Sequence, residues 1–304
     1  MADKTNIVIW GYCIRGVEVL EKVGKIEEYE FMGFADNSVY KQGNYVCGKP
    51  IYSPEELCLL LGDKNISVII AIEKWREVEE ECKEKKIRIE AVYMGGELHR
   101  YPFPTFETLD YAGGIRLYAG DICDDIHKNI KDLYGLSLHR MDSRHMKHDV
   151  REKYPIPDNS IVAYEAEDVF EYVKKEKQID AINEIYRILK PGGYVRFTLP
   201  DYNSPYLKRR TMYSPAGEFL FDAVGGGTFG ADGISDNGSI YFATYEDFKE
   251  TLEKTMFSKT EWLCYYTGDG FLCKKYIDMD KGYVNRVSNE SEDNVYCLIV
   301  DCYK

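Results

Sequence analysis

INEIYRILKPGGYVRFTLPD, residues 182–201, is the stretch that decides the fold of this chain. Isoleucines recur at helical spacing through its first half, and Lys190 places a cation in the last turn of the predicted helix. Pro191 cannot continue a helix, so the two glycines after it are expected to reverse the chain. Residues 194–199 alternate and are rich in β-forming side chains, and Pro200-Asp201 stops them. The stretch therefore predicts a helix, a tight glycine turn and a strand.

The composition is that of a globular protein with more than one domain. A chain of 304 residues with 44% hydrophobic and 30% charged side chains is long enough to bury two cores. It has no run of about 18 apolar residues and no secretory signal pattern at its start. We therefore expect a cytoplasmic protein without membrane insertion. A net charge of −13 disfavours nucleic acid as a partner, and the dense basic cluster Lys208–Arg210 is expected on a solvated loop.

Neither the cysteines nor the acidic residues predict a metal site. The nine cysteines are scattered among apolar neighbours without a Cys-x-x-Cys pair, which is typical of reduced, buried thiols. The acidic run Glu165, Glu167, Asp168 and Glu171 has the spacing of anions at the start of a helix. We interpret this run as structural.

Alternating strand and helix patterns in the first third of the chain predict a parallel sheet. Strands are expected at residues 6–10, 30–35, 67–72 and 90–93, with helices at 17–23, after Ser53, and at 75–86. Residues 99–112 carry two prolines and no sustained period, so they are the predicted linker. The expected domains are therefore residues 1–98 and 113–304, both of the α/β class.

The first domain carries an altered glycine fingerprint. Gly11 and Gly16 keep the outer positions of Gly-x-Gly-x-x-Gly, while Cys13 takes the middle position, where glycine lets the backbone approach a pyrophosphate. Asp36 follows the second strand, where it can accept from a ribose hydroxyl. These residues are the candidates for nucleotide binding. A domain that only packs and dimerises is the alternative, and nicotinamide-dependent oxidoreduction is disfavoured because it needs the intact fingerprint.

The second domain restarts a sheet at residues 115–119, which end in Gly120-Asp121. A second strand is expected at 136–141, so that Asp142 lies at its carboxyl end and can accept from both hydroxyls of a ribose. A turn-forming or N-capping aspartate is the alternative. Further strands are expected at 161–164, 261–266 and 295–302, with a helix at 245–255. His145 and His148 have charged neighbours and are expected at the surface.

Glu184, Arg187 and Leu189–Gly193 resemble the Glu-x-x-Arg-x-Leu-Lys-Pro-Gly-Gly segment of class I S-adenosylmethionine-dependent methyltransferases. His148-Asp149-Val150 and residues 154–160 are similar to the segments before the fourth strand of that family. The resemblance implies a Rossmann-like fold that closes with an antiparallel strand pair, and S-adenosylmethionine as cofactor. The cofactor-binding residues implied are Tyr118, Gly120, Asp121, Asp142, Asp149 and Glu167. Tyr118 stands at the first glycine position of the usual Gly-x-Gly, where its ring could fill space that the cofactor requires.

Residues 6–95 resemble the amino-terminal Rossmann-like domain of bacterial sugar-modifying enzymes in surface-polysaccharide pathways. The resemblance rests on GFADNSVYKQGNYVCGKPIYSPEEL, residues 33–57, in which an Asp-Asn pair, a Gly-x-Pro turn and Ser-Pro-Glu-Glu-Leu follow in that order. It implies either binding of a nucleotide sugar or a scaffold without a ligand.

Methyl transfer from a sulfonium requires alignment of the acceptor, and an oxygen acceptor benefits from a general base. Asp201, at the end of a strand, is the candidate base, with Tyr202 beside it. The tyrosines and glycines after them, including Tyr206, Tyr213 and residues 225–227, form an expected mobile loop whose rings either stack on a sugar or pack the loop.

Two functions are therefore expected. In the first, the protein is a methyltransferase acting on a sugar or nucleotide-linked sugar of a bacterial surface glycan, with a small molecule or sugar as its substrate. In the second, the methyltransferase fold is catalytically degenerate and binds a nucleotide sugar or a partner. A homo-oligomer is compatible with either.

Overall fold

The computed structural model describes residues 4–60, 66–122, 127, 130–226, 238–288 and 295–304. The chain forms two compact units, Met1–Phe103 and Pro104–Lys304. The division falls within the segment predicted as a linker, although His99 and Arg100 of that segment belong to a strand, β7. None of the helices in the described residues is long and apolar enough to span a membrane.

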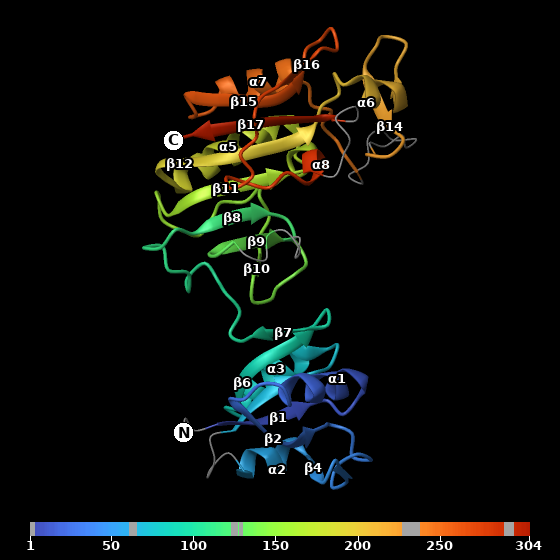
Figure 1. The fold of residues 1–304 in the computed structure, drawn as a ribbon, viewed down its shortest axis with the longest axis vertical. Helices are drawn as coiled ribbons and strands as arrows, with labels where there is room; N and C mark the ends of the chain where they lie inside the picture. The colour runs from blue at the N-terminus through green and yellow to red at the C-terminus, as the bar shows by residue number, and fades with distance from the viewer. Residues whose placement is uncertain (1–3, 61–65, 123–126, 128–129, 227–237, 289–294) are drawn as a thin grey trace. The chain divides into compact units, whose positions relative to one another are not determined.

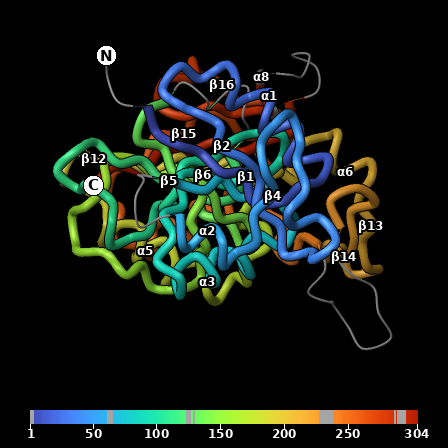
Figure 2. Tube along the Cα trace, turned by 90° about the horizontal axis from the view of Figure 1, so that it is seen from below, coloured from blue at the N-terminus to red at the C-terminus, as the bar shows by residue number. Residues whose placement is uncertain are grey.

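The first unit is built on a sheet whose central strands are parallel. Its strands are β1 (Thr5–Trp10), β2 (Tyr29–Ala35), β3 (Tyr45–Val46), β4 (Lys49–Tyr52), β5 (Ile66–Ile70), β6 (Arg88–Met94) and β7 (Glu97–Arg100). Their order is β3-β4-β2-β1-β5-β6-β7. Strands β1, β2, β4 and β6 of this sheet are labelled in Figures 1 and 2. The strands from β4 to β6 pair in parallel, and β3 and β7 add antiparallel edges. The predicted strands are therefore present, and β3, β4 and β7 were missed.

Three helices accompany this sheet: α1 (Ile14–Val23), α2 (Pro54–Leu60) and α3 (Trp75–Glu84). Helix α2 begins with a reciprocal cap, in which the Ser53 hydroxyl accepts from the Glu56 amide and the Glu56 carboxylate accepts from the Ser53 amide. Val19 and Val23 of α1 join the buried core of this unit, which also includes Ile7, Ile9 and Phe34.

The second unit is built on an eight-stranded sheet. Its strands are β8 (Arg116–Ala119), β9 (Leu133–Ser137), β10 (His145–Lys147), β11 (Ile161–Glu167), β12 (Leu189–Pro200), β15 (Lys259–Tyr266), β16 (Leu272–Lys274) and β17 (Cys297–Tyr303). The order is β10-β9-β8-β11-β12-β17-β15-β16. The first five strands are parallel, and β17 runs antiparallel to both β12 and β15 (Figure 1). The antiparallel pair expected near the carboxyl terminus is therefore β15 and β17.

The opening stretch forms helix α5 (Lys175–Ile188) and strand β12, but the glycine turn differs from the prediction. Strand β12 already begins at Leu189, which pairs with Ile161, and the register resumes only at Tyr194 opposite Ala163. Residues 190–193 are therefore a bulge within the strand, where Gly192 adopts a φ of +80°. Lys190 does not cap α5, because its Nζ donates to the carbonyls of Tyr111 and Gly113.

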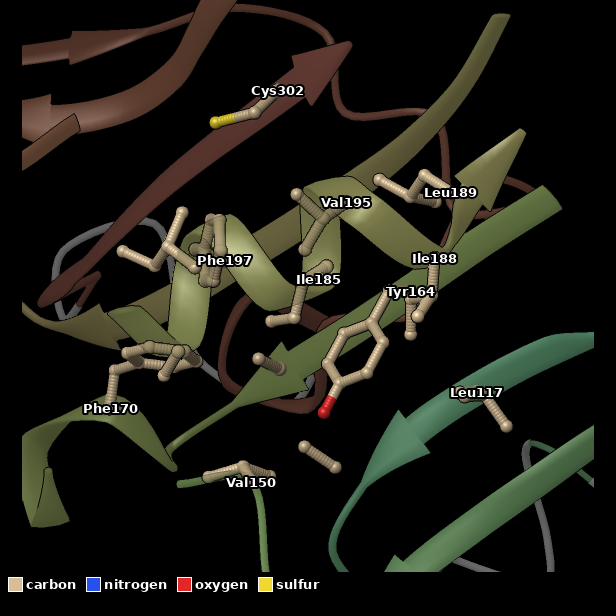
Figure 3. Packing of buried hydrophobic residues seen from close by; sticks show 14 of the residues in the cluster. Leu117, Val150, Tyr164, Phe170, Ile185, Ile188, Leu189, Val195, Phe197 and Cys302 are labelled. Atoms are coloured by element: carbon tan, nitrogen blue, oxygen red, sulfur yellow. The ribbon is translucent and has the colours of Figure 1, made fainter. Parts of the chain in front are cut away.

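Helix α5 buries its apolar face against the sheet. Ile185 and Ile188 lie beside Tyr164, Val195 and Phe197 of the adjacent strands (Figure 3). All five side chains are fully buried, and burial of each large apolar side chain contributes about 1.5–3 kcal/mol. The isoleucine spacing in the sequence therefore gave the buried face of this helix.

The motif residues Glu184 and Arg187 hold the chain that precedes β11. The Arg187 guanidinium donates to the Tyr154 and Ile156 carbonyls and pairs with Glu184 and Asp158. The Glu184 carboxylate also accepts from the Tyr154 amide at 2.9 Å. These motif residues act in this structure as a clamp between α5 and residues 154–158.

Strand β11 is longer than predicted. Glu165 and Glu167 were expected at the start of a helix, but both lie in β11, and only a short 3₁₀ turn, η1 (Phe170–Tyr172), follows. Glu165 is 3% exposed, in register with Tyr118 on one side and Arg196 on the other. No group of three potential metal ligands gathers within the described residues. The prediction that this acidic run begins a helix is wrong, because Glu165 and Glu167 lie in a strand.

The segment after Asp201 contains more regular structure than expected. It forms α6 (Pro205–Arg210), the hairpin β13 (Thr211–Tyr213) and β14 (Phe219–Asp222), and α7 (Tyr245–Glu253); α8 (Asn285–Ser288) follows later. Tyr202 packs its ring on Phe219 and Phe242, so it packs the segment rather than facing solvent. Gly227, the last of the predicted glycine run, lies outside the described residues.

Candidate functional site

A pocket of about 480 Å³ lies at the carboxyl ends of four adjacent parallel strands. Its lining follows each strand in turn: Gly120 and Asp121 after β8, Leu136–Leu138 at the end of β9, His148–Arg151 after β10, and Asp168, Val169, Tyr172 and Val173 after β11. Ligand sites of open parallel α/β sheets lie at this edge, and the volume is in the range of small-molecule sites. We therefore take this pocket as the candidate functional site.

The turn after β8 forms one wall of the pocket. Gly120 has a φ of +112°, and its amide donates to the Leu136 carbonyl of β9 at 2.8 Å. A residue with a side chain rarely adopts this φ, so glycine allows the chain to turn here. Gly120 and Asp121, two predicted cofactor residues, both line the pocket.

Tyr118 does not line the pocket. Its side chain is 8% exposed and belongs to a buried cluster with Ile122 and Leu133. Its ring centroid lies 4.9 Å from that of His127. The ring that was expected to compete with a cofactor is therefore packed into the protein in this structure.

Asp149 supplies a carboxylate to the pocket. The Arg151 guanidinium donates to both of its oxygens, with Nε–Oδ1 at 2.9 Å and Nη2–Oδ2 at 2.5 Å. This pairing lowers the pKa of Asp149, so the group is anionic at neutral pH. The Arg151 amide also donates to Oδ1 and Arg151 Nε also donates to Oδ2, so each oxygen already accepts two hydrogen bonds and a ligand at Asp149 would share or replace these donors. Arg151 was not identified from the sequence.

Asp142 does not have the predicted position. Strand β9 ends at Ser137 rather than Met141, so Ser137 and Leu138 occupy the strand end at which the ribose acceptor was expected. Asp142 is 2% exposed and lies in the turn before β10. The alternative of a turn-forming aspartate describes it better, because its oxygens accept from the Arg144 and His145 amides.

His145 and His148 are both buried, which contradicts their predicted surface location. His148 packs against the rings of Phe106 and Tyr154 and still contributes to the pocket lining. Burial lowers the pKa of His148, so its imidazole is neutral near neutral pH. The burial of His148 results from packing against Phe106 and Tyr154, which the charged residues beside it in the sequence do not indicate.

The predicted catalytic residues do not face the pocket. Asp201 is fully buried, and its oxygens accept from the Asn203 and Tyr266 amides at 2.9 and 2.6 Å. Burial raises the pKa of Asp201 to about 6, while the two amide hydrogen bonds oppose this change. Tyr202 is also fully buried and donates to Asp222 at 2.9 Å. Both residues are held by partners within the protein, and neither is part of the pocket lining.

Glu167 ends β11 and is half-buried, but it is not part of the pocket lining. The residues after it, Asp168 and Val169, line the pocket instead, and Asp168 adopts a φ of +53°. The predicted site residues that meet at the pocket are therefore Gly120, Asp121 and Asp149.

In the first unit, the altered fingerprint forms a tight turn between β1 and α1. A Cβ at Gly16 would lie 2.0 Å from the Gly11 carbonyl oxygen, so the two glycines allow a close approach of helix and turn. Cys13 is exposed, and its amide donates to the Gly11 carbonyl. Asp36 accepts from the Tyr12 amide and from the Lys41 ammonium, at 2.9 and 2.8 Å. The carboxylate expected to receive a ribose is thus already engaged by the protein.

Comparison with known proteins indicates the class of protein that the second unit resembles. Residues 104–197 match a family model described as a methyltransferase domain. This segment contains β8 to β11, the start of β12 and every residue of the pocket lining. The match supports a class I methyltransferase fold for this unit and S-adenosylmethionine as its cofactor. No match was found among curated proteins.

Solved structures with similarity to the chain include an S-adenosylmethionine-dependent methyltransferase from Thermotoga maritima, described as a possible histamine N-methyltransferase. It is 15% identical, with 63% of this chain and 82% of that chain covered and a TM-score of 0.39. A methyltransferase from Archaeoglobus fulgidus is 15% identical, with 64% and 88% covered and a TM-score of 0.39. One from Mesorhizobium loti is 16% identical, with 65% and 94% covered and a TM-score of 0.37. TM-scores this low do not establish the fold or the function of this chain.

Proposed function

We propose that the protein is an S-adenosylmethionine-dependent methyltransferase of the cytoplasm that acts on a sugar or nucleotide-linked sugar of a surface glycan. The observation that carries the proposal is the pocket at the carboxyl ends of β8, β9, β10 and β11. It lies wholly within the residues that match the methyltransferase domain. The eight described cysteines are free thiols, which supports a reducing compartment.

The pocket residues fit the cofactor. The Gly120 turn brings backbone close to the ligand space, and Asp121 and Asp149 supply carboxylates for its hydroxyl and amino groups. Leu138 and Val150 give apolar surface for a flat ring. When bound, S-adenosylmethionine supplies a methyl group that its sulfonium already activates.

The chain's own contribution is to bind and align the reactants. Holding two reactants in a productive geometry can supply about 7–11 kcal/mol of a reaction barrier. Tyr172 and Val173 line the pocket beside Asp168, at the carboxyl end of β11, where an acceptor could meet the cofactor. His148 is a neutral imidazole in the same lining and is 8% exposed.

The sugar acceptor is supported by the first unit. Its sequence resembles domains of sugar-modifying enzymes, and its sheet is largely parallel. Saturation-transfer NMR on the full chain with a series of nucleotide sugars tests this part of the proposal. Transfer to the sugar protons of at least one of them is expected, and no transfer from any would refute the proposed acceptor class.

Calorimetry of the full chain with S-adenosylhomocysteine tests the cofactor. Binding is expected, and its absence at millimolar ligand would refute the proposed function. Asp149→Asn is expected to weaken binding roughly tenfold or more, because a hydrogen bond to a charged group contributes about 1.5–3 kcal/mol. Asp158→Asn is the matched control, since Asp158 also pairs with an arginine but lies outside the pocket.

A degenerate fold that only binds a ligand is the alternative function. The match to a methyltransferase domain does not favour it. In the sequence, Tyr118 was the main feature that favoured a degenerate fold, because its ring could fill the cofactor space. In the structure this ring packs away from the pocket.

A further inference from the structure

Asp142 lies at the centre of the turn that precedes β10. Its Oδ1 accepts from the Arg144 amide at 2.8 Å, the His145 amide at 3.1 Å and His145 Nδ1 at 2.8 Å. Its Oδ2 accepts from Arg140 Nε at 2.6 Å. Burial by itself raises the pKa of Asp142, but these hydrogen bonds outweigh burial and hold the pKa well below its ordinary value. The carboxylate is therefore a fixed, buried anion.

His145 connects this carboxylate to the wall of the pocket. Its side chain is 1% exposed, and its Nε2 accepts from the Ile122 amide at 2.9 Å. An amide can only donate, so Nε2 carries a lone pair and the ring proton is on Nδ1, facing Asp142. Ile122 follows Gly120 and Asp121 directly, so this bond fixes the chain at the end of the pocket turn.

Two further contacts connect the turn before β10 to the chain that forms the pocket wall. A Cβ at Gly135 in β9 would lie 2.5 Å from His145 Cδ2 and 2.9 Å from the Gly120 carbonyl oxygen. Glycine at this position therefore makes room for the imidazole against the pocket turn. Arg144 Nη2 also donates to the His127 carbonyl at 2.8 Å. The turn thus holds the chain after Gly120 at two points, Ile122 and His127.

We propose that Asp142 and His145 are positioning residues of the pocket, in which Asp142 fixes the Nδ1-protonated tautomer of His145 and His145 Nε2 holds the Ile122 amide. Neither side chain lines the pocket, so they act through the Gly120–Asp121 turn rather than on a ligand. The hydrogen bond between His145 Nε2 and the Ile122 amide follows from the geometry and does not depend on the proposed function. Its effect on S-adenosylhomocysteine affinity rests on the proposed function.

Two substitutions at His145 separate the hydrogen bond from simple packing. His145→Leu keeps an apolar volume but leaves the buried Ile122 amide without an acceptor. His145→Gln is the conservative variant, because its Oε1 can still accept from that amide. Phe248→Leu is the control, since Phe248 is a fully buried residue of α7 that packs on Phe197 and Trp262, outside the turn and the pocket.

Amide hydrogen exchange measures the contact without any ligand. His145→Leu is expected to raise the exchange rate of the Ile122 amide by about tenfold or more, the factor that corresponds to about 1.4 kcal/mol. His145→Gln is expected to retain most of the protection, and Phe248→Leu should leave it unchanged relative to neighbouring amides. Equal protection of Ile122 in the wild type and His145→Leu would overturn the proposal.

Calorimetry with S-adenosylhomocysteine then measures the consequence. His145→Leu is expected to weaken binding about tenfold or more, with His145→Gln close to the wild type and Phe248→Leu unchanged. Equal affinity of all four proteins, with Ile122 exchange altered, would overturn the positioning role. A wild type that does not bind S-adenosylhomocysteine would refute the proposed function, and the exchange experiment would still decide whether His145 holds the turn.

Discussion

Replacing Glu165 with glutamine should change how the stability of the second unit depends on pH. Glu165 lies in β11 with 3% exposure, and neither of its carboxylate oxygens has a hydrogen-bond partner among the residues that the structure describes. A Cβ on Gly282 would lie 3.0 Å from the Glu165 carboxyl carbon, so the chain at Gly282 packs directly on this carboxyl group. The structure therefore buries an acid without solvating it.

Burial raises the pKa of Glu165 from 4.5 to about 7. Arg116 and Arg196 oppose this change, and the carboxylates of Glu167 and Asp301 add to it. Since the folded state binds this proton more tightly than the unfolded state, the contribution of Glu165 to the free energy of unfolding is largest below pH 4.5 and is lost as the pH rises to about 7. At 1.36 kcal/mol per pH unit, this interval corresponds to about 3 kcal/mol.

Urea unfolding at about pH 4.5 and about pH 8 measures this quantity for the wild type and Glu165→Gln. Glutamine does not titrate, so the difference in free energy of unfolding between the two proteins should change by about 3 kcal/mol in favour of the variant as the pH rises. Any fixed cost of burying the amide cancels in this comparison. So does the titration of Asp201, which both proteins share. Parallel stability curves for the two proteins across this range would refute the reasoning.

Three further substitutions test other parts of the fold. Arg196→Met removes one partner of the buried Arg196–Asp301 pair and should lower the free energy of unfolding of the second unit by about 3–5 kcal/mol; an equally stable variant in urea unfolding would contradict this. Gly16→Ala places a Cβ 2.0 Å from the Gly11 carbonyl oxygen, so calorimetric scans should show a lower Tm for the first unit alone, and an unchanged Tm would show that the turn can relax. Ser53→Ala removes the cap of α2 and should cost about 1 kcal/mol, measured by urea unfolding, with Ser38→Ala, at a half-buried serine of the same unit, as the control.

Residues with local signals were predicted well. The alternation of strands and helices in the first unit is present, because hydrophobic periodicity depends only on neighbouring residues. Gly120 and Asp121 reach the pocket because they follow β8, whose end was predicted at Ala119. Asp149 was identified from the family resemblance, since strand β10 before it was not predicted.

Site residues whose position depends on distant contacts were predicted poorly. Strand β9 ends at Ser137, several residues before the expected point, so Asp142 was assigned to the wrong place. Asp201 was expected at an open edge, but residues 203 and 266 supply amides that surround it. Arg151, Val169 and Tyr172 carried no sequence signal, since only the packing of η1 and the segment after β10 brings them together.

The sequence by itself determined the class of fold, and residues 182–201 show why. Isoleucine spacing and an alternating apolar run act through local backbone geometry, and they specify a helix and a strand. The proline and the two glycines between them form a bulge in the strand rather than the predicted reversal. Only the tertiary structure decided which polar groups are available to a ligand. Tyr118, Asp142 and Asp201 are polar residues near strand ends in the sequence, yet all three are buried in the folded unit. A buried polar group needs partners, and Asp201 obtains one of them, the Tyr266 amide, from a strand 65 residues further along the chain.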